Sequence, residues 1–168
     1  LGESWEEQGD AVEYDTLLQR RLSYDKTNVP EDVLVITAGV DTQKDRLECQ
    51  LVGWGKNYEA WVLDYEIFWG DPNAFQVWQD LDVYLKKRYK TETNRIIPIS
   101  CACLDSGGFH TNQVYAFTKP RQARRIFAIK GLSTAGKPIA NRPTFVGKNK
   151  AVLYGVGTDT AKEAIFAR

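Results

Sequence analysis

The nine residues VLVITAGVD at positions 33–41 decide the fold. The first eight form an unbroken apolar run that is rich in β-branched residues, and the run ends at Asp41. Such a run is typical of a strand that is covered on both faces. We therefore predict a central strand over 33–40, with the carboxylate of Asp41 at the point where this strand ends.

Two further strands are predicted directly after the first. Residues 47–54 form a second strand-like run, and over 59–68 apolar side chains alternate with others, which suggests one wetter face. The connections between the three runs are short and polar. We therefore expect a three-stranded antiparallel meander.

A helix and a second buried strand are predicted after the meander. Apolar side chains recur at helical spacing over 74–89, and the basic residues 86–88 suit the negative end of a helix dipole. Residues 96–104 form another apolar run, which ends at Asp105. The two buried strands, each closed by an aspartate, are expected to lie side by side.

The remaining elements are predicted to be short. We expect a helix over 111–118, a strand over 125–129, a long loop over 131–150, a strand over 151–157 and a helix over 160–168 that starts with a Thr160–Glu163 capping box. Three antiparallel strands, a crossover helix and then parallel strands make a mixed α/β sheet, flanked by helices on both faces. The RNase H-like fold is the best known fold with this order.

The organisation of the chain is predicted from its two ends. Residues 1–28 are acidic and polar, with a helical candidate at 13–23, and we interpret them as a linker and entry helix before a domain over 29–168. The chain starts without Met and ends within an expected helix, so we expect a fragment of a longer protein.

Three cysteines in apolar surroundings argue against a disulfide framework and for a reducing compartment. No apolar run reaches the length of a membrane span, and the first residues do not resemble a signal peptide.

A net charge of zero hides a strong asymmetry along the sequence. Residues 1–32 carry nine carboxylates and three basic residues, whereas residues 106–158 carry no carboxylate. The basic residues of the second stretch are Lys119, Arg121, Arg124, Arg125, Lys130, Lys137, Arg142, Lys148 and Lys150. Binding to a polyanion would explain a long stretch without acids. The alternative is a chance composition around a flexible basic loop.

Asp41 and Asp105 are the first candidate site residues, because neighbouring strands would bring them to the same edge of the sheet. Two carboxylates close together repel each other unless a cation lies between them. Hard oxygen ligands select Mg²⁺ or Mn²⁺, and two such ions could activate water and stabilise the leaving oxygen of a phosphodiester. The alternative for each aspartate is a turn or capping role.

Other residues are candidates for the same site. Asp159, just before the last expected helix, is the candidate for a third metal ligand, although an ordinary helix-start aspartate is the alternative. Glu48 and Asp64, on the strands next to the first, are weaker candidates. His110, the only histidine, could contact the scissile phosphate or act as a base, or it could cap the helix that follows.

Several segments together resemble the phage lambda-type terminase large subunit. They are LGESWEE (1–7), ITAGVDTQKDRLE (36–48), VGWG (52–55), LDSGGFHT (104–111) with Val114 and Tyr115, and YGVGTDTAK (154–162). The resemblance runs along almost the whole chain. It implies the C-terminal RNase H-like nuclease domain of such a protein, which follows an N-terminal ATPase domain. The absence of a GxxxxGK[ST] phosphate loop from this sequence agrees with that assignment.

The resemblance implies a metal-dependent DNA endonuclease that cuts concatemeric double-stranded viral DNA during packaging. By motif, Asp41, Asp105 and Asp159 would hold two Mg²⁺ or Mn²⁺ ions for phosphodiester hydrolysis. The basic residues of 106–158, apart from Lys130, would contact DNA. The implied partners are the ATPase domain, the small terminase subunit and the procapsid portal, in the host bacterial cytoplasm and away from membranes. The alternatives are an RNase H-like integrase or resolvase, and a DNA-binding or scaffold module without activity.

Overall fold

The computed structural model describes residues 14–19, 21–24, 26–147 and 150–167. Residues 1–13, 20 and 25 of the predicted linker and entry helix lie outside these residues, and its described part contains the short helix α1 (Tyr14–Gln19). Lys148, one of the predicted DNA contacts, also lies outside them. The helices of the described part are all too short or too polar to cross a lipid bilayer.

The predicted antiparallel meander is confirmed. Strand β1 (Val35–Thr42) pairs with β2 (Arg46–Trp54), and β2 pairs with β3 (Ala60–Trp69), both antiparallel. A short 3-10 helix, η1 (Lys56–Tyr58), lies in the β2–β3 connection. The register places Asp41 directly opposite Glu48.

The second half of the sheet is parallel, as predicted. Strand β5 (Ile96–Asp105) lies beside β1, followed by β6 (Ile126–Leu132) and β8 (Ala151–Gly157), all parallel to their neighbours. Two short strands, β4 (Arg88–Lys90) and β7 (Thr144–Val146), pair antiparallel with β5 and β8. The strand order β3-β2-β1-β5-β6-β8-β7 describes an RNase H-like mixed sheet flanked by helices, which confirms the predicted fold class.

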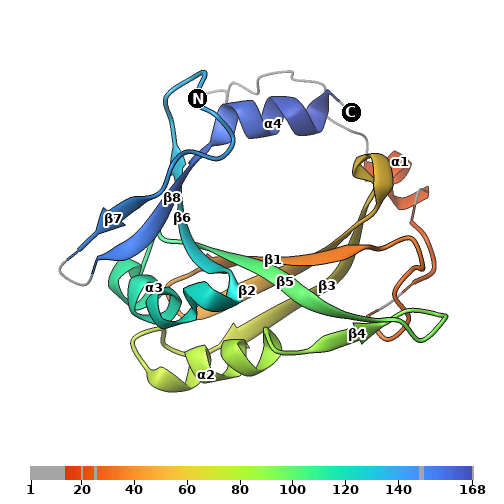
Figure 1. Cartoon of the computed structure of the whole chain (residues 1–168), viewed down its shortest axis with the longest axis horizontal. Helices are drawn as coiled ribbons and strands as arrows, with labels where there is room; N and C mark the ends of the chain where they lie inside the picture. Colours follow the sequence, from red (N-terminus) through yellow and green to blue (C-terminus); the bar gives the residue numbers. More distant parts are fainter. Residues whose placement is uncertain (1–13, 20, 25, 148–149, 168) are drawn as a thin grey trace, which may run out of the picture.

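The hydrophobic core lies between one face of the sheet and two helices, α2 (Phe75–Tyr84) and α3 (Thr111–Thr118) (Figure 1). In β1, Ile36, Ala38 and Val40 are buried on this face, whereas Gly39 and Asp41 are exposed on the other. The predicted coverage of β1 on both faces is therefore wrong for the described residues. Small and β-branched side chains hide the alternation, because they suit both faces of a strand.

Two predicted elements differ from the structure. The helix predicted over 74–89 ends at Tyr84, and the chain then turns so that β4 pairs with β5. The basic residues 86–88 therefore lie beyond the helix, where Lys86 pairs with Asp82 at 2.7 Å. The loop predicted over 131–150 contains the strand β7, which forms a ribbon with β8.

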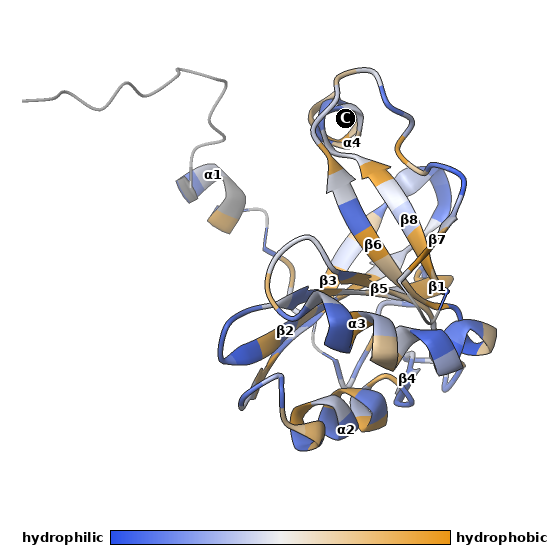
Figure 2. Ribbon diagram, turned by 90° about the vertical axis from the view of Figure 1, so that its left-hand side faces the viewer, coloured by the Kyte–Doolittle hydropathy of each residue, from blue (hydrophilic) through white to orange (hydrophobic). Residues whose placement is uncertain are grey.

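The last helix, α4 (Thr158–Phe166), lies on the side of the sheet opposite α2 and α3 (Figure 2). It starts two residues earlier than predicted, with Gly157 at its N-cap. The predicted capping box is wrong, because the Thr160 hydroxyl donates to the carbonyl oxygen of Lys137 at 2.7 Å. A β-carbon at position 157 would lie 2.3 Å from that same carbonyl oxygen, so only glycine allows the preceding loop to approach so closely.

Candidate active site

Three carboxylates border one depression on the face of the sheet that α2 and α3 leave open. Parallel pairing aligns Val40 of β1 with Leu104 of β5, so the next residues, Asp41 and Asp105, lie at the same edge. On the other side of Asp41, antiparallel pairing places Glu48 opposite it. These side chains border a depression of about 400 Å³, which is lined by Gly39, Val40, Asp41, Glu48, Gln50, Tyr65, Cys103, Asp105 and Ile129.

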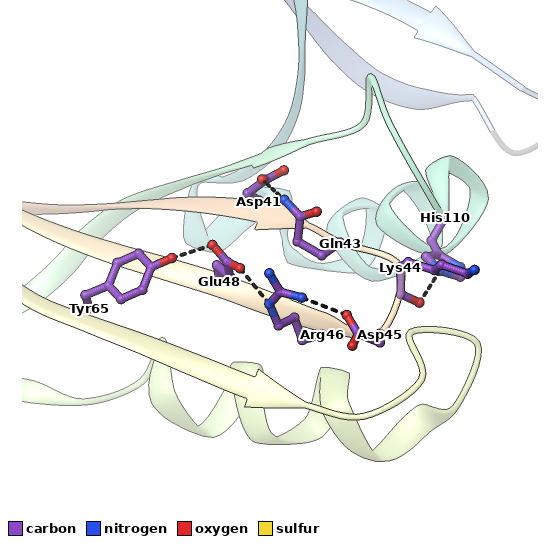
Figure 3. Close-up of polar contacts among 8 residues, drawn as sticks. All are labelled: Asp41, Gln43, Lys44, Asp45, Arg46, Glu48, Tyr65 and His110. Atoms are coloured by element: carbon purple, nitrogen blue, oxygen red, sulfur yellow. Dashed lines mark hydrogen bonds and ion pairs between the residues drawn. The ribbon is translucent and has the colours of Figure 1, made fainter.

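Asp41 and Asp105 are each oriented by a donor close in sequence. The Gln43 side-chain amide donates to Asp41 Oδ2 (Figure 3). The backbone N–H of Gly107 donates to Asp105 Oδ1 at 2.8 Å. A β-carbon at position 107 would lie only 3.2 Å from that oxygen, so glycine lets the turn fold against the carboxylate. The turn role considered for Asp105 is therefore present in the structure, together with its position in the depression.

Glu48 is held by donors on both of its oxygens (Figure 3). Arg46 Nε donates to Oε1 at 2.6 Å, and the Tyr65 hydroxyl donates to Oε2. The bond from Tyr65, followed by that from Arg46, lowers the pKa of Glu48 below its usual value, because both stabilise the ionised form. The same contact raises the pKa of Tyr65, which therefore keeps its proton.

The depression has a strong negative charge. Its lining contains three carboxylates and no lysine or arginine. Within the described residues, no group of three His, Cys, Asp or Glu side chains already converges in a way that could hold a metal ion, so these carboxylates border the depression without closing on one point. Carboxylate oxygens that face a common space are the ligand type that hard divalent cations prefer.

Comparison with known proteins places the chain in a family. The model of the family described as "Terminase large subunit gpA, endonuclease domain" matches residues 1–168.

The chain belongs to this terminase endonuclease family.

Relatives of known name agree with this assignment. The terminase large subunit of Escherichia phage lambda is 37% identical over 169 residues, and that of Enterobacteria phage P21 is 34% identical over the same length. Each alignment covers 100% of the chain and 26% of the relative, so the chain spans about a quarter of these proteins. No solved structure matches the chain.

The third metal ligand that was predicted for the terminase endonuclease domain, Asp159, lies outside the depression. It is in the first turn of α4, after the end of β8, and β8 is separated from β5 by β6. Helix α4 lies on the side of the sheet opposite α2 and α3 (Figure 2), and the depression opens on this same face, where Gly39 and Asp41 are exposed. Asp64 lies on the opposite face, where it accepts a hydrogen bond from the Tyr84 hydroxyl at 2.7 Å and pairs with Lys26.

His110 connects three parts of the terminase endonuclease domain and is absent from the lining of the depression. Its Nδ1 lies 3.3 Å from Asn73 Oδ1, and its Nε2 lies 3.2 Å from the carbonyl oxygen of Lys44. The residue is also the N-cap of α3, with a left-handed backbone at φ 56°. The structure therefore places this side chain against the β1–β2 turn and the start of α2 (Figure 3).

The predicted DNA-binding residues fall into two groups. Arg121 and Arg124, in and at the end of the 3-10 helix η2 (Lys119–Arg124), contact Asp82 of α2 at 2.7 and 2.6 Å. Burial favours a higher pKa for Asp82, but the bonds from Arg121, Lys86 and Arg124 outweigh it and hold the pKa well below the usual value. These two arginines stabilise the helix side of the domain.

The second group is exposed and makes no ion pair with any residue in the described part of the chain. Its members are Lys119, Arg125, Lys137, Arg142 and Lys150. The loop that carries Lys137 and Arg142 is fixed to the start of α4, since the Gly157 N–H donates to the Pro138 carbonyl at 3.1 Å. The loop that carries them therefore lies beside the start of α4, on the side of the sheet opposite α2 and α3 (Figure 2).

Three residues whose side chains bond to Asp41 or Glu48 were not among the sequence candidates: Gln43, Arg46 and Tyr65. Gln43 and Arg46 lie within the motif 36–48, so their proximity to Asp41 and Glu48 was a usable signal. Tyr65 carries no such signal, because its contact with Glu48 depends on the register between β2 and β3.

Proposed function

We propose that this terminase endonuclease domain cuts double-stranded DNA by divalent-metal-dependent hydrolysis of the phosphodiester backbone. The observation that carries the proposal is the negative charge of the depression, to which Asp41 and Asp105 contribute from adjacent parallel strands and which Arg46, through its pair with Glu48, offsets only in part. A carboxylate pair without a basic neighbour in the lining is electrostatically unfavourable unless a cation lies between its members.

The donor set fits Mg²⁺ or Mn²⁺. All acidic groups of the depression are carboxylates, and the only soft donor in its lining is the thiol of Cys103. When bound, one or two divalent ions would supply Lewis acidity at the phosphate and lower the pKa of water. The chain supplies the fixed orientation: Gln43 holds Asp41, and the Gly107 N–H holds Asp105. Both carboxylates are then pre-oriented by their neighbours, as ligating carboxylates usually are.

Asp159 is proposed as a third ligand, from the far side of the depression. It is the first carboxylate after the acid-free stretch, and α4 places it on the open side of the sheet. The contact of Thr160 with Lys137 fixes the first turn of α4 to the preceding loop.

The biological setting follows from the relatives, which are named terminase large subunits. We propose that the domain cuts concatemeric viral DNA in the cytoplasm of the bacterial host. Its partners would be an ATPase domain in the same polypeptide, a small terminase subunit and the portal of the procapsid.

Metal removal tests the proposal directly. With Mn²⁺, the chain is expected to convert supercoiled plasmid to nicked and linear forms, and EDTA is expected to abolish this conversion. Re-addition of excess Mn²⁺ should restore it, because the ligands are carboxylates that chelation leaves intact. The measurement is the loss of supercoiled DNA over time on agarose gels. Equal cleavage with and without EDTA would contradict the proposal, and metal-independent binding without cleavage would favour a scaffold role.

The DNA contacts are expected to come from the loop near α4. Lys137→Gln combined with Arg142→Gln should weaken binding to a duplex and reduce the slope of log K against log salt by about 2, since each phosphate contact contributes about 0.9. Fluorescence anisotropy at several salt concentrations measures both quantities. Arg88→Gln combined with Lys90→Gln removes the same charge from exposed positions of β4 and serves as the control. An equal loss of affinity in both double variants would refute a specific role for the loop.

A further inference from the structure

The β2 side of the depression carries a carboxylate that the predicted set of three aspartates does not include. Glu48 lies opposite Asp41 in the β1–β2 ladder, and both line the depression. We propose that Glu48 is a further metal-binding carboxylate of the cutting centre and that Tyr65 and Arg46 are its positioning residues. This inference rests on the proposed function and extends it to the β2–β3 side of the sheet.

The pairing of β1 with β2 is the first observation that supports a metal-binding role for Glu48. Residues directly opposite each other in an antiparallel pair have β-carbons about 4.5–5.5 Å apart, and like charges in such a pair are destabilising. The neighbours of Glu48 in β2, Leu47 and Cys49, are fully buried on the opposite face, so Glu48 must share the open face with Asp41. A cation shared between the two carboxylates would convert this repulsion into attraction.

The contacts of Arg46 are the second observation. They indicate that Arg46 orients the Glu48 carboxylate without neutralising the charge of that carboxylate. The guanidinium also contacts Asp45 at 2.8 Å, so one positive charge is divided between two carboxylates. Its carbon Cζ lies 5.2 Å from the centre of the Trp69 ring, which further fixes its position. With Asp41 and Asp105 included, the centre keeps a clear excess of negative charge.

The hydrogen bonds of Glu48 leave room for a metal. Arg46 occupies one lone pair of Oε1, and Tyr65 occupies one lone pair of Oε2. A carboxylate has about four acceptor positions, so each oxygen keeps one that is available for a cation in the depression. The two donors come from β2 and β3, and they hold the carboxylate plane from two directions (Figure 3).

The acids of β3 differ from Glu48, which lies on β2, because they pair with a lysine on the other face of the sheet. Asp64 and Glu66 pair with Lys26, at 3.2 and 3.6 Å, and neither lines the depression. Their charges are therefore used within the fold. Among the carboxylates of the β2–β3 hairpin that the structure describes, Glu48 is the one that faces the candidate centre.

Mn²⁺ binding to the DNA-free chain tests the inference without relying on cleavage. Isothermal titration calorimetry is expected to show affinity for Mn²⁺ that falls about 100-fold in Glu48→Gln and about tenfold in Tyr65→Phe, in line with the effects of ligands and their outer partners. Tyr65→Phe removes only the hydroxyl, and it keeps the test valid if Glu48→Gln folds poorly. Glu92→Gln, an exposed residue of the β4–β5 turn, is the matched control and should bind Mn²⁺ like the unmodified chain.

Two results separate failure of this inference from failure of the proposed function. If Glu48→Gln and Tyr65→Phe bind Mn²⁺ as tightly as Glu92→Gln while Asp105→Asn does not, the role of Glu48 is overturned and the centre stands without it. If Asp105→Asn also binds Mn²⁺ as tightly as the control, the proposed function fails and the inference fails with it. Weakened binding in Glu48→Gln and Tyr65→Phe, with intact circular dichroism spectra, supports the inference.

Discussion

Asp105→Asn is expected to abolish metal-dependent DNA cleavage while the fold remains intact. Asparagine has the same shape as aspartate and keeps an oxygen that can accept the Gly107 N–H, so the turn after β5 is preserved. The substitution removes the negative charge that a divalent cation requires. We expect the rate to fall by at least about a thousandfold, which corresponds to about 4 kcal/mol in the activation free energy.

The measurement is the initial rate of plasmid nicking at saturating Mn²⁺, together with a circular dichroism spectrum. Asp32→Asn makes the same chemical change at an exposed position before β1 and is expected to leave the rate unchanged. If the Asp105→Asn variant folds normally and still cuts at the original rate, the catalytic role of this edge of the sheet is wrong.

Leu104→Ala, one residue earlier, is expected to have the opposite effect: it lowers the stability of the fold but removes no carboxylate from the depression. Leu104 is fully buried on the face of β5 that packs against the helices, whereas Asp105 points to the open face. Truncation of a buried leucine removes its transfer free energy and leaves a cavity, at a cost of about 2–5 kcal/mol in the free energy of unfolding. This is a large fraction of the total stability of a typical domain.

Urea denaturation measures this effect as a lower midpoint with an unchanged slope. Ile96→Ala removes a similar number of atoms from an exposed position of the same strand, so its effect is expected to be small. Equal midpoints for Leu104→Ala and Ile96→Ala would contradict the assignment of the packed face. Substitutions at two adjacent residues of β5 would thus act on different properties: Leu104→Ala on stability and Asp105→Asn on catalysis.

The adjacency of Asp41 and Asp105 was predictable because topology alone determines it. A meander followed by a crossover helix places the next strand beside the first one, and parallel strands end at the same edge. The family resemblance of the segments around these residues agrees with the family match along the whole chain. The order of the strands and the family resemblance are both read from long segments of the sequence, and neither depends on a single side-chain contact.

Other features could not be predicted, because they depend on partners that are distant in sequence. The acid-free stretch contains a set of cations, but composition does not show that Asp82 binds Arg121, 39 residues away. Similarly, the helical periodicity over 74–89 continues past Tyr84, while the pairing of β4 with β5 ends the helix there. Tertiary pairing outweighs local propensity in both cases.

The turn between β1 and β2 has a consequence for how the gene for such a domain can vary. Residues 43–45 connect the two strands, and the Gln43 N–H donates to the Arg46 carbonyl at 3.0 Å. An inserted or deleted residue that displaced β2 by one step would reverse its pleat relative to β1. Leu47 or Cys49 would then stand next to Asp41, and Glu48 would be forced into the packed layer. The length of this turn is therefore constrained, although Lys44 and Asp45 within it are exposed.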